Sequence, residues 1–240
     1  MAANHSEHGF NWVSLVPGLA EQPNHVVMAA AVLLVLTVMT GIASLQLKKR
    51  MQDMDTALVP EPKLTYRNFF EIIAEKLYGL TEQTLGKHDA PLYFPLIGTL
   101  FVFIFASNIL GLIPGFLPPT DNLNTTLAMS SFVFLYYNYK GIQANGLGYL
   151  KHFMGPVWWL APLMFAIELI SHLIRPISLA FRLRWNITGD HIVMRVFIDL
   201  VPLLVPVGFL GLGLFVSLIQ AFVFCMMTMV YISLATAHDH

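Results

Sequence analysis

The sequence predicts an all-α, polytopic membrane protein, and three observations lead to this class. Of the 240 residues, 56% are hydrophobic and only 11% are charged, whereas a soluble domain carries about 25% charged residues. A soluble protein of this size could not bury so much apolar surface. The apolar residues also form long continuous runs, which favours helices over the alternating strands of a membrane barrel. This composition excludes a disordered chain, a nucleic-acid binder and, with Cys225 as the single cysteine, a disulfide scaffold.

Five apolar stretches account for the membrane spans that we expect. A helix crosses about 30 Å of hydrocarbon with roughly 20 apolar residues. The stretches cover residues 26–47, 90–120, 122–139, 153–192 and 200–237. Only the fourth contains charged residues. The last is long enough to form either one helix or two, over 201–214 and 215–234, so we expect about five spans, with six as the alternative.

The basic residues predict how the spans are oriented, because lysine and arginine in short loops favour the cytoplasmic side. The basic run 48–50 follows the first span and places residues 1–25 outside the cytoplasm. Lys140 and Lys151 mark the loop after the third span as cytoplasmic, and the turn 118–121, which has no positive charge, suits the outer side. Five spans then return the C-terminus to the cytoplasm.

A charged segment over residues 48–89 separates the first two spans and contains an expected cytoplasmic amphipathic helix. Its apolar residues recur at helical spacing and form one stripe: Tyr66, Phe69, Phe70, Ile73, Leu77 and Leu80. Such a helix could rest on the membrane surface or on a partner. An ordinary surface helix with one apolar face remains an equal alternative.

The fourth span carries an unusual polar stripe. At 100° per residue, five side chains share an arc of about 80° that rises about 27 Å along the helix: Glu168, His172, Arg175, Arg182 and Asn186. Arg184 points to the opposite side. Charged groups at bilayer depth cost a few kcal/mol each, so they face a partner, a cavity or an ion path.

Two interpretations of this stripe stay open for its first members. Glu168 and Arg175 are two turns apart and could simply join a buried polar network, and His172 could be a structural histidine. Arg182 differs, because the nearest acid on its face, Asp190, lies two turns away. An arginine without an acid nearby in its own chain predicts a partner in another chain.

The last span carries a second, neutral stripe. Its polar residues fall within about 80° of one another, with Phe224 among them: Ser217, Gln220, Thr228 and Tyr231. Serine and threonine often bond to their own helix backbone, so Gln220 is the stronger signal. We expect this stripe to lie along Arg182 and line an aqueous path.

Several motifs in the right order resemble the ATP synthase subunit a family. Residues 175–186, RPISLAFRLRWN, resemble its RPxSLxxRLxxN signature. Residues 219–231, IQAFVFCMMTMVY, are similar to the motif of its terminal helix. The segments 108–115, NILGLIPG, and 124–128, NTTLA, resemble its second and third spans. The resemblance covers about residues 90–240.

This resemblance implies a non-catalytic, proton-translocating stator subunit of the F-type ATP synthase. The chain would form a single integral membrane domain whose residues 153–237 fold into a long helical hairpin against the ring of c subunits. The implied partners are this c-ring, the b-subunit peripheral stalk, other ATP synthase subunits, the lipid bilayer and protons, with no nucleic acid. Neither a cofactor nor a metal is expected. We expect the inner membrane of a bacterium, because no transit peptide is seen.

The resemblance also implies roles for single residues. Arg182 matches the arginine that faces the ring, and Asn186 and Gln220 match polar partners near it. Glu168 and His191 match residues of the two proton half-channels. The remaining candidates for proton translocation are Ser178, Asp190 and His172.

The sequence departs from the common family pattern near these residues. Arg184-Trp185 replaces an aromatic-glycine pair, and the segment Gly189-Asp190-His191 is also unusual. Gly213 stands where the family often has a second ionisable group, so His191 would act alone. The coupling ion, proton or sodium, stays open.

Other membrane functions fit the sequence less well. A secondary transporter, the main alternative, should show two related halves, and none is seen. A haem site needs paired histidines, but His172 and His191 share one helix and are too far apart. A protease motif such as HExxH is absent. The terminal pairs His5/His8 and His238/His240 could suggest a metal, but we expect exposed ends there.

Overall fold

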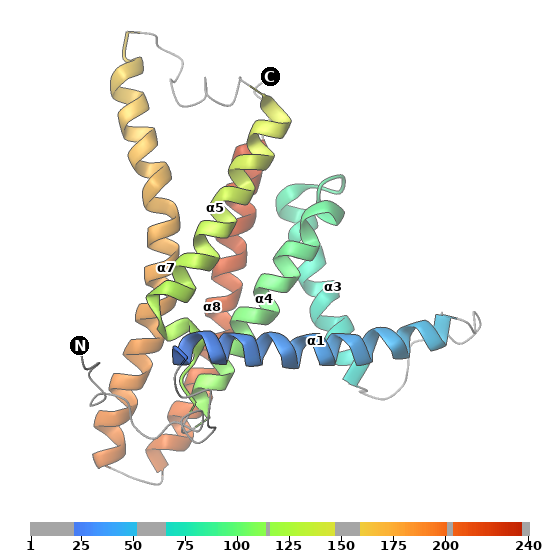
Figure 1. Ribbon diagram of the computed structural model, residues 1–240, viewed down its shortest axis with the longest axis vertical. Helices are drawn as coiled ribbons and strands as arrows, with labels where there is room; N and C mark the ends of the chain where they lie inside the picture. The colour runs from blue at the N-terminus through green and yellow to red at the C-terminus, as the bar shows by residue number, and fades with distance from the viewer. Residues whose placement is uncertain (1–21, 52–65, 114–115, 147–158, 201–203, 237–240) are drawn as a thin grey trace.

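The computed structural model describes residues 22–51, 66–113, 116–146, 159–200 and 204–236 (Figure 1). The described part of the chain contains only helices. In order they are α1 (Asn24–Met51), α3 (Tyr66–Leu85), α4 (Ala90–Leu112), the short 3-10 helix η2 (Pro119–Asp121), α5 (Leu123–Asn145), α7 (Ala161–Leu200) and α8 (Leu204–Thr236). The predicted all-α class is confirmed. Lys151 and both terminal histidine pairs lie outside the described residues.

In the part of the chain that the structure describes, four helices are long and apolar enough to cross a membrane. These segments are Asn24–Leu45, Ala90–Leu112, Pro162–Gly189 and Gly208–Thr236, in agreement with a polytopic membrane protein. Helix α5 has 23 residues and corresponds to the third expected span, 122–139, but it is more polar. Asparagine and threonine at its start, and Lys140 and Gln143 near its end, reduce its apolar character.

The C-terminal segment forms one helix. Helix α8 runs without a break from Leu204 to Thr236, so the alternative of two helices over 201–214 and 215–234 is wrong. Helix α7 is also continuous, over 40 residues and through Pro176. At 1.5 Å per residue these helices are about 60 and 50 Å long. Since the hydrocarbon is about 30 Å thick, they must tilt strongly or extend beyond it.

Helix α1 lies across the other long helices. In Figure 1, α4, α5, α7 and α8 run roughly alongside one another, and α1 crosses them at a steep angle. One planar bilayer cannot hold both α1 and the α7–α8 pair upright. The polar stripe on α7 rises about 27 Å along the helix, which is close to the thickness of the hydrocarbon. The stripe would therefore span the hydrocarbon only if α7 stands upright in the membrane.

The core lies where α4, α8 and α5 meet. Its fully buried side chains include Ile97, Ile104, Val133, Phe224 and Met229. The buried Cys225 thiol contacts the Ile97 carbonyl oxygen at 3.5 Å. Large apolar side chains remain exposed on α1, α7 and α8, as expected for a protein whose outer surface meets lipid or other subunits.

The expected amphipathic helix begins at Tyr66 and packs by its apolar stripe within the chain. Leu77 is buried, and Ile73 packs against the core. Helix α3 contacts α4 and α8, which favours the alternative of an ordinary surface helix with one apolar face. A turn at Gly86 joins α3 to α4, and its φ of +86° is a conformation that favours glycine.

Candidate functional site

Helix α7 has a buried face and an open face, and Arg182 lies at the border between them. Leu179, Leu183 and Ile187 are buried where α7 packs on α5 and α8. The side chains of Arg182 and Ser178 are exposed. Among the described residues, Arg182 has no hydrogen-bond or ion-pair partner. The predicted lack of a partner within the chain therefore holds for the described part.

Glu168 and Arg175 form an ion pair on α7. Arg175 Nη2 donates to Glu168 Oε1 at 3.3 Å, with about a quarter and a third of the two side chains exposed. The Arg175 guanidinium also lies 5.4 Å from the ring centre of Tyr231 on α8, within range of a cation–π contact. This partly exposed pair agrees with the alternative that Glu168 and Arg175 join a polar network within the chain, whereas the contact with Tyr231 was not predicted.

Asn186 and Gln220 join the two polar stripes one turn after Arg182. Asn186 Nδ2 donates to Gln220 Oε1 at 2.6 Å, and the Gln220 side chain is 4% exposed. This hydrogen bond fixes the rotation of α8 relative to α7 at this level. The structure thus brings together both polar residues that were expected close to Arg182.

His172 is enclosed between α7 and α5. It is 6% exposed, and its Nε2 lies 2.7 Å from Asn138 Oδ1. The rings of Phe134 and Tyr137 lie against the imidazole, with centroids at 5.0 and 5.4 Å. These contacts favour the structural alternative for His172. Asn138 was missed because a lone asparagine in an apolar stretch gives no periodic signal.

The neutral stripe of α8 points into the bundle. Ser217 and Thr228 are buried, and the Thr228 hydroxyl donates to the Phe224 carbonyl at 2.9 Å. Among the described side chains, Gln220 and Tyr231 are the members of this stripe that contact polar side chains of α7. The expectation that the whole stripe lines an aqueous path is therefore not supported for Ser217 and Thr228.

Gly213, where a second ionisable group was considered, is closely covered by α4. A Cβ atom at this position would lie 2.5 Å from Leu112 Cδ2. The leucine therefore occupies the space that a side chain at position 213 would need. Asp190 and His191 belong to α7, but their side chains lie outside the described residues.

A further polar contact at η2 was not predicted. The Thr188 hydroxyl donates to Asp121 Oδ1 at 2.8 Å, and Arg184 lines a pocket beside Asp121. Arg184 and Thr188 are four residues apart and so share a face of α7, which is the signal that could have revealed this site. In the described part of the chain, no three potential metal-ligating side chains come together.

Comparisons with known proteins agree with these observations. The family profile described as ATP synthase A chain matches residues 27–233. ATP synthase subunit a of Bdellovibrio bacteriovorus is 44% identical over 96% of this chain and 99% of its own length. ATP synthase subunit a of Geobacter sulfurreducens is 51% identical over 72% of this chain and 76% of its own length. That of Sorangium cellulosum is 43% identical over 87% of this chain and 82% of its own length. The chain belongs to the ATP synthase subunit a family.

Proposed function

We propose that the chain is the proton-translocating stator subunit of a bacterial ATP synthase and that Arg182 faces the carboxylates of the c-ring. The ATP chemistry belongs to other subunits of that complex. The observation that carries this proposal is an exposed arginine on a long apolar helix, without a partner among the described residues.

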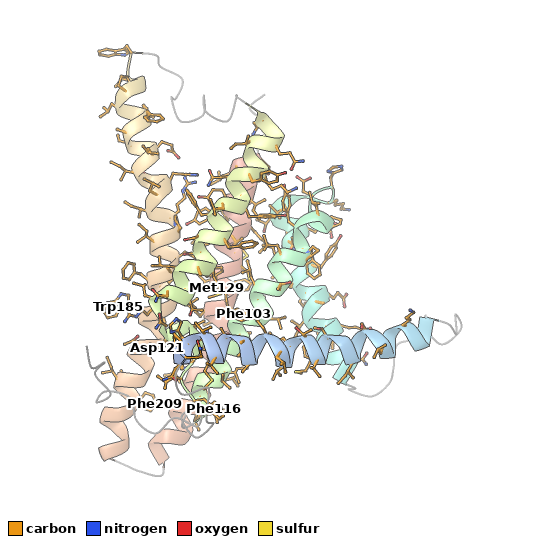
Figure 2. All side chains as sticks on the ribbon, in the orientation of Figure 1. Phe103, Phe116, Asp121, Met129, Trp185 and Phe209 are labelled. Atoms are coloured by element: carbon orange, nitrogen blue, oxygen red, sulfur yellow. The ribbon has the colours of Figure 1, made fainter. Side chains whose placement is uncertain are left out.

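The surroundings of Arg182 support a partner that covers this face of α7. Apolar side chains on both sides of it are exposed, including Ile174 at 52%, Phe181 at 38% and Trp185 at 63%. Figure 2 shows Trp185 on the side of α7 away from the bundle. An unpaired arginine facing lipid is costly. A neighbouring helix with one carboxylate in an apolar surface would cover the face and neutralise the charge.

The fixed charge of Arg182 explains how ion flow could be coupled to rotation. A ring carboxylate next to a guanidinium favours its ionised form and so releases its proton. Arginine keeps its own proton, so it cannot pass protons directly between two half-channels. The carboxylate is neutralised again from the other half-channel and can then move into lipid. Each charge that crosses the field contributes about 2.3 kcal/mol per 100 mV.

Neighbouring residues of α7 suit the two half-channels on either side of Arg182. Glu168 lies about 21 Å before Arg182 along the helix, and His191 about 14 Å after it. Asp190 is next to His191, and Ser178 is one turn from Arg182. A proton relay through Glu168 has to open its 3.3 Å contact with Arg175.

The Asn186–Gln220 pair could provide polar hydrogen-bonding groups for a ring carboxylate beside Arg182. Both are neutral amides, so they can donate to a carboxylate without holding it as tightly as a second cation would.

We further propose that the chain works in the bacterial inner membrane with its N-terminus outside and its C-terminus in the cytoplasm. Its partners there are the c-ring and the b-subunit stalk.

ATP-driven proton pumping in inverted membrane vesicles tests this proposal. We expect Arg182→Ala and Arg182→Lys to reduce pumping to background while the complex still assembles, because alanine lacks the charge and lysine can lose its proton. Lys87→Ala, at an exposed position between α3 and α4, serves as the control. Pumping by both Arg182 variants would refute the proposed role of Arg182.

A further inference from the structure

A polar pocket of about 470 Å³ opens where the start of α1, η2 and α7 meet. Its volume is typical of small-molecule sites. Five polar residues line it: Asn24, His25, Asp121, Asn122 and Arg184. Figure 2 shows Asp121 at this junction. We propose that the pocket binds the headgroup of a zwitterionic aminophospholipid, with the phosphate on Arg184 and the ammonium on Asp121.

The two charges of the pocket, on Asp121 and Arg184, do not form an ion pair with each other. The Thr188 hydroxyl donates to Asp121 Oδ1 at 2.8 Å and fixes the carboxylate. Among the described residues, neither Asp121 nor Arg184 has an ion-pair partner, although both line the same pocket. Two opposite charges in the lining of one pocket match a ligand that carries both charges.

The chemistry of the two groups decides which end of the ligand each one binds. The planar guanidinium of Arg184 offers paired donors that fit phosphate oxygens. The Asp121 carboxylate accepts hydrogen bonds from a primary ammonium group. An anionic lipid without an amine would satisfy Arg184 but would bring a second negative charge towards Asp121. Charge complementarity therefore favours the zwitterion.

The surface beside the pocket favours a lipid over a soluble aminophosphate. Val26 directly follows His25 and is 51% exposed, and Leu33 and Leu34 continue the exposed apolar surface along α1. Leu117 and Leu123 add apolar atoms to the pocket wall. A headgroup in the pocket would leave its acyl chains beside the exposed apolar side chains at the start of α1, where they cover part of this surface.

Lipid retention by the assembled ATP synthase tests this inference. The purified complex is stripped of lipid, mixed with phosphatidylethanolamine, phosphatidylglycerol or soluble phosphoethanolamine, and washed, and the bound ligand is measured by mass spectrometry. We expect retention of phosphatidylethanolamine above that of phosphatidylglycerol. Asp121→Asn and Arg184→Gln should each weaken it about tenfold, the effect of one lost charge-assisted hydrogen bond. Arg184→Lys should have an intermediate effect.

Matched controls remove the same charges elsewhere. Lys87 and Asp89 lie between α3 and α4. We expect Lys87→Gln and Asp89→Asn to leave the retention of phosphatidylethanolamine unchanged. Equal retention in the pocket variants and the wild type would refute the site. If phosphatidylglycerol is retained as well as phosphatidylethanolamine, the proposed role of Asp121 is refuted. If soluble phosphoethanolamine binds as well as phosphatidylethanolamine, the claim that the ligand is a lipid is refuted. None of these outcomes depends on Arg182, so proton pumping can fail or succeed separately.

Discussion

Three arginines lie in one ten-residue stretch of α7, residues 175–184, and their surroundings distinguish their roles. Arg175 pairs with Glu168 and lies against Tyr231. Arg184 faces the pocket at η2. Only Arg182 is exposed on the open face without a partner among the described residues. Arg184 also has no ion-pair partner among the described residues, but it lines a pocket of its own chain. An exposed charge on the open face, such as that of Arg182, is the one that we expect another subunit to neutralise.

Gln220→Leu tests the amide pair beside Arg182. The substitution removes the 2.6 Å hydrogen bond from Asn186 and leaves that amide without its partner on α8. Since the volume change is small, we expect normal assembly and a several-fold slower rate of ATP-driven proton pumping in vesicles. Gln143→Leu, at an exposed position on α5, is the control. An unchanged pumping rate in Gln220→Leu would remove Gln220 from the ion path.

His172→Ala tests whether this buried histidine is structural. The change removes the contact with Asn138 and leaves a cavity among aromatic rings, which together cost about 2–4 kcal/mol of unfolding free energy. We expect a lower thermal midpoint of the complex, with pumping per assembled complex close to wild type. His172→Gln should be milder because it keeps a polar partner for Asn138. Lost pumping at unchanged thermal stability would show instead that His172 relays protons.

At the scale of elements, close glycine contacts hold the segment before η2 against α4. A Cβ atom on Gly111 would lie 2.7 Å from Pro118 Cγ and 3.0 Å from its Cβ. The proline ring cannot rotate away. The contact therefore fixes the start of η2, and with it Asp121, relative to the end of α4.

Gly111→Ala tests this contact. The added methyl group has to push the segment at Pro118 outward, and overpacking of this kind costs about 1–3 kcal/mol. We expect a thermal midpoint several degrees lower. Gly98→Ala, in the same helix, meets only Phe94 Cζ at 3.9 Å and should be neutral or stabilising. Equal midpoints for the two variants would show that α4 and η2 do not pack as described.

The elements could be predicted from the sequence better than the contacts between them. The apolar periodicity starting at Tyr66 identified α3, and the uncharged runs identified α1, α4 and α8. The stripe from Glu168 to Asn186 followed from helix geometry within α7. The contacts of Arg175 with Tyr231 and of His172 with Asn138 could not follow, because they depend on the relative rotation of two helices, which periodicity in one helix does not determine.

At the scale of the whole molecule, the contacts are consistent with the predicted sidedness. The start of α1 and the turn before α5, both expected outside, line one pocket. The ends of α5 and α8, both expected in the cytoplasm, are joined by a hydrogen bond from Asn145 Nδ2 to the Ala235 carbonyl at 3.2 Å. These contacts group the ends as the prediction groups them, and the basic residues predict which group is cytoplasmic.

Cysteine labelling tests this orientation. We expect Gln22→Cys, at an exposed position before α1, to react with a membrane-impermeant maleimide in intact cells stripped of any outer membrane. Gln143→Cys, near the end of α5, should react only in inverted vesicles. Native Cys225 is fully buried and should give little background. The opposite labelling pattern would invert the topology, and labelling of both positions from one side would contradict the expected crossings.

The central claim is that Arg182 keeps two proton half-channels apart at the ring, and passive proton conductance tests it most directly. The measurement uses vesicles that carry the membrane sector without the ATP-hydrolysing subunits, driven by a potassium diffusion potential. With Arg182→Ala, protons should pass between the half-channels without ring rotation, so conductance should rise well above that of the wild type and of Lys87→Ala. Conductance that stays at the wild-type level in Arg182→Ala, with the sector fully assembled, would contradict this claim.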